Sequence, residues 1–332
     1  MAAKTILHSN TNTHGEYHGI DIIKFFCSYL ICMVHIAPFV RGTPLFDNLN
    51  FYIQNGICRI AVPFYFATTA FLLFRKQDGN KPLEKGMLKK TCFKLFRLWG
   101  IWAFLLVFGG QIHLWYLGAT ALTVLLMNLF FKLIKSVRAI GIVCAFFYVI
   151  GLLGDSYRGF ISPILDLIPF NLPSTRNAVC MGLMFAFIGV IITKYQIRIR
   201  LRTAVVGLML SILLLYTEVF LLKMYSNPFD FNMCLSHIPT TFFLLYIAIN
   251  IKNKNTSCCF RKLRAYGVLI YFTHLLISSL FDLVFSGIKT VASIDLMPIK
   301  IFLVFIVVTV LAIIIEKLSR KNHLSWLRYL YS

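Results

Sequence analysis

The residues GIDIIKFFCSYLICMVHIAPF, at positions 19–39, decide the fold, because they place three ionisable side chains inside an apolar run long enough to cross a membrane. About 20 apolar residues span the hydrocarbon core of a bilayer. An ionisable side chain inside such a helix costs about 2.5 to 3.5 kcal/mol, so Asp21, Lys24 and His35 should pair with other groups or face a polar interior. This stretch therefore predicts a spanning helix that lines a cavity.

Apolar runs of similar length recur along the whole chain. Of its 332 residues, 59% are hydrophobic and 14% are charged, and the mean hydropathy is +0.78. This composition excludes an ordinary water-soluble domain, and the 32 Phe and 15 Tyr exclude a disordered chain. We predict an all-α polytopic membrane protein with about ten transmembrane helices, at 20–41, 52–74, 92–109, 113–131, 139–153, 177–194, 203–222, 233–251, 265–285 and 298–316.

The predicted domain organisation is simple. Residues 1–19 form a polar tail, residues 20–317 form one transmembrane domain, and residues 318–332 form a basic tail. The first apolar run is too long for the core of a signal peptide and lacks a small-residue cleavage site. We therefore expect it to be retained as a spanning helix.

The strong positive charge is explained by topology. The chain has 33 Lys and Arg against 12 Asp and Glu, an excess that would suggest nucleic acid as the partner of a soluble protein. Most of these basic residues fall in alternate loops, so the positive-inside rule places those loops and both termini in the cytoplasm, beneath the inner membrane. No nucleic-acid partner is expected. The most basic loop, 75–97, should attract anionic lipid or an anionic cytosolic substrate.

The nine cysteines do not indicate a metal site or a disulfide framework. They are scattered, mostly within apolar stretches, and form no Cys-x-x-Cys pair. This pattern favours thiols that act as small apolar residues, and no metal is expected.

A polar stripe runs along the first spanning helix. Lys24 and His35 are eleven residues apart, which at about 100° per residue leaves them about 20° from alignment, on one face. Asp21 and Ser28 extend this stripe, which is about 16 Å long from lysine to histidine. A neutral imidazole keeps one nitrogen that accepts a proton, so His35 is a candidate general base. Alternatively, Asp21 and Lys24 form an interfacial ion pair and His35 only hydrogen-bonds a neighbouring helix.

Other ionisable residues near the spans are weaker candidates. Lys94 and Arg97 share a helix face and suit the phosphates of a cytosolic cofactor, although basic residues at this position also serve as membrane anchors. Arg59 and Arg176 are either buried in the protein or extend to the interface, and His274 is either a site residue or a hydrogen-bonded core histidine.

Six segments taken in order resemble the acyltransferase family 3 membrane proteins. The first span carries the family signature of a basic residue, ten residues and a histidine, here Lys24 to His35. The other five segments are RIAVPFYFATTAFLLFRK (59–76), KLFRLWGIW (94–102), HLWYLGA (113–119), TRNAVCMGLMFAFIGVII (175–192) and YGVLIYFTHLLI (266–277). The chain is also similar to membrane domains fused to serine/alanine racemases. Two positions depart from the family pattern: Lys94 replaces the first Arg of an RxxR motif, and Thr68 stands near the usual Ser-Gly.

The resemblance implies an acyltransferase of the cell envelope. Its reaction would be O-acetylation or a related acylation, in which acetyl-CoA or another cytosolic acyl-CoA acylates a hydroxyl of an envelope polysaccharide or related acceptor. The implied roles are a general base at His35, orientation of the stripe by Asp21 and Ser28, and cofactor binding by Lys24, Lys94, Arg97 and Arg59.

A second class of function stays open at this stage, namely a permease for a small polar solute such as an amino acid. Polar side chains inside the membrane are equally expected in a conduit. The cations Lys24, Lys94 and Arg97 favour the enzyme, because a permease for a neutral solute does not need them. Contacts to the acceptor are expected in the outer loops, 154–176 and 223–232.

Overall fold

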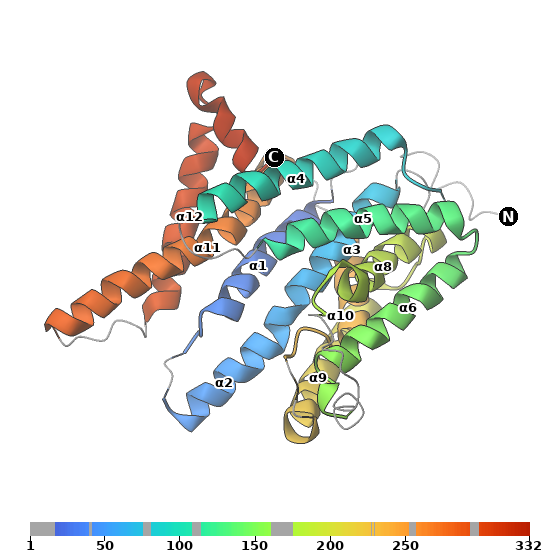
Figure 1. The fold of residues 1–332 in the computed structure, drawn as a ribbon, viewed down its shortest axis with the longest axis horizontal. Coiled ribbons are helices and arrows are strands. Elements are labelled where there is room, and N and C mark those ends of the chain that lie inside the picture. Colours follow the sequence, from blue (N-terminus) through green and yellow to red (C-terminus); the bar gives the residue numbers. More distant parts are fainter. Residues whose placement is uncertain are drawn as a thin grey trace.

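A computed structural model describes most of the chain, as a bundle of helices (Figure 1). The described residues are 17–39, 42–75, 81–107, 114–160, 175–226, 228, 230–251, 257–292 and 299–332. The α-helices are α1 (His18–His35), α2 (Pro44–Asn55), α3 (Ala61–Phe74), α4 (Lys85–Val107), α5 (Trp115–Leu133), α6 (Val137–Gly154), α8 (Leu183–Tyr195), α9 (Leu201–Tyr225), α10 (His237–Asn250), α11 (Ser257–Ala292) and α12 (Lys300–Leu318). Shorter 3-10 or π segments are η1 (Ile57–Ile60), η3 (Ala178–Gly182) and η5 (Asn322–Leu330).

The predicted all-α membrane fold is confirmed. Each of the ten predicted spans overlaps a helix, and no strand occurs in the described ranges. Within those ranges, eight helical segments are long and apolar enough to cross a membrane. Two predicted spans are not among them: α4 carries many basic residues in its first half, and α10 has only 14 residues.

Helix boundaries differ from the prediction where polar residues extend a helix. The second span was expected to begin at residue 52, but α2 begins at Pro44 and continues through η1 into α3. Thr43 starts this helix, because its hydroxyl accepts a hydrogen bond from the amide of Phe46. Likewise, α11 has 36 residues where the apolar pattern predicted 265–285.

The first helix lies at the centre of the packing. It packs mainly against α11, and it also contacts α10, η1 and α3. Ile20, Cys27 and Ile31 join an apolar cluster with α3 and α8, whereas Cys32 and Ile36 join a second cluster with α11 and α12. Thus α1 connects two groups of helices.

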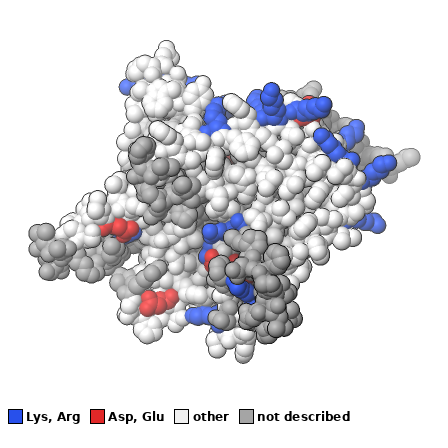
Figure 2. Space-filling model, viewed as in Figure 1, with Lys and Arg blue, Asp and Glu red and all other residues white. Residues whose placement is uncertain are grey.

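Basic side chains gather toward one edge of the molecule. On the face drawn in Figure 2, many of the visible Lys and Arg lie along the upper right, over α4 and the neighbouring helix ends, and others lie near the centre and the lower edge. The concentration along the upper right is what the positive-inside rule predicts for a cytoplasmic edge. The cytoplasmic location of that edge stays a prediction.

The C-terminal residues fold back on the bundle. The indole of Trp102 in α4 donates to the carbonyl of Leu330 at 2.9 Å. The hydroxyls of Tyr331 and Ser319 are 2.7 Å apart. The segment that the sequence presents as a basic tail is therefore packed against α4 and the end of α12.

One glycine allows α3 and α8 to pack closely. A Cβ atom added to Gly189 would lie 2.2 Å from the carbonyl oxygen of Ala67 and 2.7 Å from the amide nitrogen of Phe71. Both atoms belong to the backbone of α3, so a rotamer change cannot relieve the clash. Small residues at such crossings let membrane helices approach closely.

We predict that Gly189→Ala destabilises the protein by about 1 to 3 kcal/mol, the usual cost of overpacking. The matched control is Gly118→Ala in α5, where an added Cβ has no neighbour within 4 Å. The control should keep or raise stability, because alanine favours helix by about 1 kcal/mol over glycine. Thermal unfolding midpoints in one detergent measure both effects. Equal midpoints for the two variants would contradict the close packing of α3 on α8.

Candidate active site

Two cavities share a wall at the centre of the bundle. The basic cavity, defined here by Lys24, Lys94 and Arg264, has a volume of about 240 Å³. The histidine cavity, defined by His35, His274, Arg59 and Arg176, has a volume of about 60 Å³. Tyr116 of α5 and Tyr271 of α11 line both cavities. These two rings, whose centroids are 6.1 Å apart, therefore separate the cationic region from the histidines.

An ion pair between α1 and α11 organises the basic cavity. Arg264 donates two hydrogen bonds to the carboxylate of Asp21, at 2.9 and 2.7 Å. The Asp21 side chain is 5% exposed and that of Arg264 is 55% exposed. A bidentate pair fixes the plane of the guanidinium. Asp21 therefore positions Arg264 at the cavity that also contains Lys24 and Lys94.

The remaining predicted cation, Arg97, contacts the C-terminal residues. Its guanidinium lies 4.8 Å from the centre of the Tyr329 ring and donates to the carbonyl of Ser332. Lys94, one turn earlier in α4, lines the basic cavity, as does Tyr331. Arg97 thus holds the segment that supplies Tyr331.

The histidine cavity brings together one histidine from α1 and one from α11. The ring of His35, an exposed residue at the end of α1, lies 5.5 Å from the ring of His274, which is only 2% exposed. The Nδ1 atom of His274 is 2.7 Å from the carbonyl oxygen of Tyr271. Because a carbonyl oxygen only accepts, Nδ1 is the donor in this contact.

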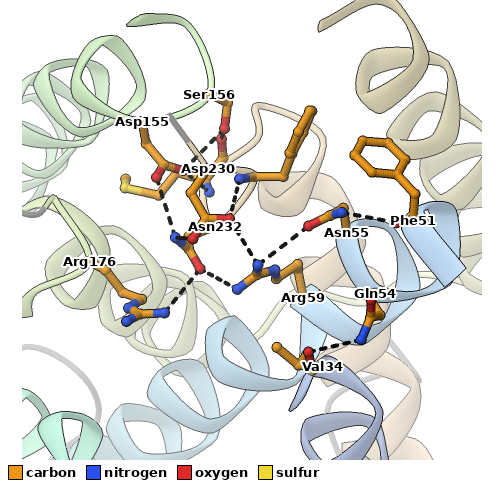
Figure 3. A network of polar contacts seen from close by, with 12 residues as sticks. Val34, Phe51, Gln54, Asn55, Arg59, Asp155, Ser156, Arg176, Asp230 and Asn232 are labelled. Carbon is orange, nitrogen blue, oxygen red and sulfur yellow. Dashed lines mark hydrogen bonds and ion pairs between the residues drawn. The ribbon is translucent and has the colours of Figure 1, made fainter. Parts of the chain in front are cut away.

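Two arginines meet around one asparagine at the other side of this cavity (Figure 3). Arg59 forms an ion pair with Asp230 at 2.9 Å and also donates to the side-chain oxygen of Asn232. Arg176 approaches the same oxygen at 3.5 Å. The amide group of Asn232 donates to Asp230 at 2.6 Å. Asn232 therefore links both guanidinium groups to an acidic partner.

Asp155, directly after α6, anchors the loop that carries Asn232. Its carboxylate accepts hydrogen bonds from the amide of Met233 at 2.8 Å and from the side chain of Asn232 at 3.3 Å. Burial raises the pKa of Asp155, although the hydrogen bond from Met233 opposes that shift. Described parts of the two predicted outer loops, 154–176 and 223–232, thus meet beside His35. Residues 161–174, 227 and 229 of these loops lie outside the described residues.

The structure groups the predicted site residues differently from the sequence. Ser28 is buried, donates to the carbonyl of Phe25 at 2.6 Å within α1, and lines neither of the two cavities. Arg59, grouped by the resemblance with the cofactor-binding cations, lies in the histidine cavity. The further candidates Arg176 and His274 lie there as well. Among the residues that the structure describes, no group of three or more His, Cys, Asp or Glu is placed to hold a metal ion.

Arg264, Tyr116 and Tyr271 line the cavities but were not predicted from the sequence as site residues. Arg264 belongs to a basic cluster that a topological role already explains. The spacing of Arg264 and Tyr271 could have revealed them. They are seven residues apart, which is close to two helical turns and places both side chains on one face of a helix. Tyr116 lies in a segment quoted for the family resemblance, but its aromatic neighbours favour an interfacial position.

Comparison with known proteins identifies a family. The model of a family described as acyltransferase domain matches residues 17–317. An amino-acid racemase of Enterococcus faecalis is 28% identical over 202 residues, which cover 52% of this chain and 28% of the relative. A serine/alanine racemase of Enterococcus gallinarum is 27% identical over 263 residues, covering 69% of this chain and 36% of the relative. The chain thus spans roughly a third of the length of these relatives. No solved structure matches significantly.

The unequal exposure of Asp21 and Arg264 predicts unequal costs of substitution. Arg264→Gln removes the guanidinium that hydrogen-bonds a buried carboxylate, whereas Asp21→Asn leaves a guanidinium that water partly solvates. We expect Arg264→Gln to lower the thermal unfolding midpoint more than Asp21→Asn. The double variant should recover part of that loss. Equal losses, or a larger loss for Asp21→Asn, would contradict this description of the pair.

Proposed function

The chain belongs to this acyltransferase domain family, and from that premise we propose that it transfers an acyl group, most often acetyl, from acyl-CoA to a hydroxyl of a cell-envelope carbohydrate or related acceptor. Family membership makes it a multi-pass membrane acyltransferase; the donor, the acceptor and the base are the proposal. The observation that carries it is the wall of Tyr116 and Tyr271 shared by the basic cavity and the cavity of His35.

The basic cavity suits the donor. Acyl-CoA carries several phosphates, and the cavity presents one guanidinium and two ammonium groups, from Arg264, Lys24 and Lys94. Arginine binds phosphate through a planar fork and lysine through a point charge. With the nucleotide held by these cations, the thin pantetheine arm extends past the wall of Tyr116 and Tyr271 and brings the thioester to His35.

Acyl transfer then requires only one proton acceptor from the protein. The imidazole of His35 takes the proton from the acceptor hydroxyl while the hydroxyl oxygen attacks the thioester carbon. The new carbon–oxygen bond forms, the carbon–sulfur bond breaks, and the CoA thiolate recovers the proton from the imidazolium. The products are the acyl ester and free CoA, and His35 returns to its neutral form.

The second candidate function is passage of a small polar solute such as an amino acid, without acyl transfer. The names of the matched relatives, amino-acid racemase and serine/alanine racemase, favour such a solute. The charge of the basic cavity favours the enzyme, because an amino acid offers Lys24, Lys94 and Arg264 a single carboxylate, whereas acyl-CoA offers several phosphates. Binding of acetyl-CoA separates the two proposals.

We predict that His35→Ala lowers acyl transfer by about 10²- to 10⁴-fold, the usual contribution of a general base. The readout is incorporation of labelled acetyl groups into an envelope fraction by membranes that contain equal amounts of each protein. His323→Ala, an exposed histidine in η5, is the matched control and should keep wild-type activity. An active His35→Ala protein would remove His35 from the mechanism.

We predict that acetyl-CoA raises the thermal unfolding midpoint of the purified protein, because a ligand of the folded state stabilises it by about 2.7 kcal/mol at 100 times its Kd. Lys94→Gln should weaken the shift at a fixed acetyl-CoA concentration. Lys85→Gln, at the opposite end of the basic half of α4, should not. A wild-type protein that shows no shift at millimolar acetyl-CoA would favour the permease.

A further inference from the structure

The two arginines of the histidine cavity differ in how their charges are balanced. Arg59 is 15% exposed and forms its ion pair with Asp230. Arg176 forms no ion pair with any carboxylate in the described part of the chain. Its side chain approaches Asn232 at 3.5 Å and lies 5.2 Å from the centre of the Trp115 ring. Arg176 therefore brings a positive charge to the cavity that these neighbours leave unbalanced.

The acidic residues of this region stand behind Asn232 and do not line the cavity. In Figure 3, Asp155 and Asp230 lie on one side of Asn232, and Arg59 and Arg176 lie on the other. Both arginines and Asn232 line the cavity, but neither aspartate does. Among the described residues, therefore, a molecule that enters the cavity meets guanidinium groups and not carboxylates.

The contacts of Arg176 also hold its guanidinium in place. The guanidinium carbon of Arg176 lies 5.2 Å from the centre of the Trp115 ring, a cation–π contact. Of its five donors, one Nη1 hydrogen is directed at Asn232, at the limit of hydrogen-bond distance. The nearby amides of Val179 and Cys180 already donate to the side chain of Asn177, so the start of η3 offers them to no ligand. The remaining donors of Arg176 match the two oxygens of a carboxylate or phosphate.

We propose that the acceptor carries an oxyanion, a carboxylate or a phosphate, in addition to its reacting hydroxyl, and that Arg176 binds this group. The inference rests on the proposed acyl transfer and narrows its acceptor class. Arg176 fixes the anionic group at the Asn232 side of the histidine cavity, and the hydroxyl of the same molecule meets His35. A neutral sugar lacks the group that Arg176 selects.

Ligand-dependent thermal unfolding of the full chain in detergent tests the proposal. The probes are sodium phosphate and sodium acetate, with sodium chloride at matched ionic strength and glucose as the neutral reference. We expect one or both oxyanions, but neither chloride nor glucose, to raise the midpoint, and the effective probe identifies the anionic group. Arg176→Gln should weaken that response about tenfold or more in apparent Kd. The apparent Kd of Arg176→Lys should fall between those of the wild-type protein and Arg176→Gln. Lysine keeps the positive charge but lacks the planar pair of N–H donors.

Lys94→Gln locates the response and separates the two proposals. Lys94→Gln should keep the rise in midpoint that the oxyanion causes and weaken the rise that acetyl-CoA causes. Arg176→Gln should weaken the rise with the oxyanion and keep the rise with acetyl-CoA. An oxyanion response that survives in Arg176→Gln, or is lost in Lys94→Gln, would overturn the assignment to Arg176. Absence of any response in the wild-type protein, or an equal response to chloride, would overturn it as well. Loss of acetyl-CoA binding alone would instead defeat the proposed acyl transfer and leave the anion site standing.

Discussion

The cost of placing charged side chains in a membrane-spanning helix governs the arrangement of this protein. Asp21, Lys24 and His35 make α1 unsuitable for contact with lipid along their face, and the bundle covers that face chiefly with α11. The same helix supplies Arg264, which pairs with Asp21, and His274, which lies beside His35. One helix pair therefore supplies polar residues to both cavities.

The two cavities divide the chemical problem of moving an acyl group from a charged carrier to a hydroxyl. In the proposed reaction, the cations of the basic cavity bind the phosphates of the donor, and His35 in the histidine cavity is the base. Tyr116 and Tyr271, whose rings are in edge-to-face contact, form the boundary between the two cavities. In this account, the protein contributes position, charge and one proton acceptor.

The helical repeat was the most informative part of the sequence. It placed Lys24 and His35 on one face, and the structure brings these residues to two adjoining cavities. Periodicity carries no information on loops, so it gave no indication that Asp230 and Asn232 meet Arg59, which is more than 170 residues away along the chain. Arg264 was not predicted for another reason. It belongs to a basic cluster, and the sequence does not distinguish a basic residue that orients the protein in the membrane from one that lines a binding site. Helix ends were misplaced at α2 and α11, where polar residues continue a helix beyond its apolar run.

The central claim is that a donor held by Lys24, Lys94 and Arg264 reaches His35 past the wall of Tyr116 and Tyr271. A cryo-electron microscopy structure with a non-hydrolysable acetyl-CoA analogue tests this path directly. The account predicts density for the phosphates at the three cations and for the acyl carbonyl beside the imidazole of His35. An analogue bound elsewhere, or one whose acyl end stops on the basic side of the two tyrosines, would contradict it.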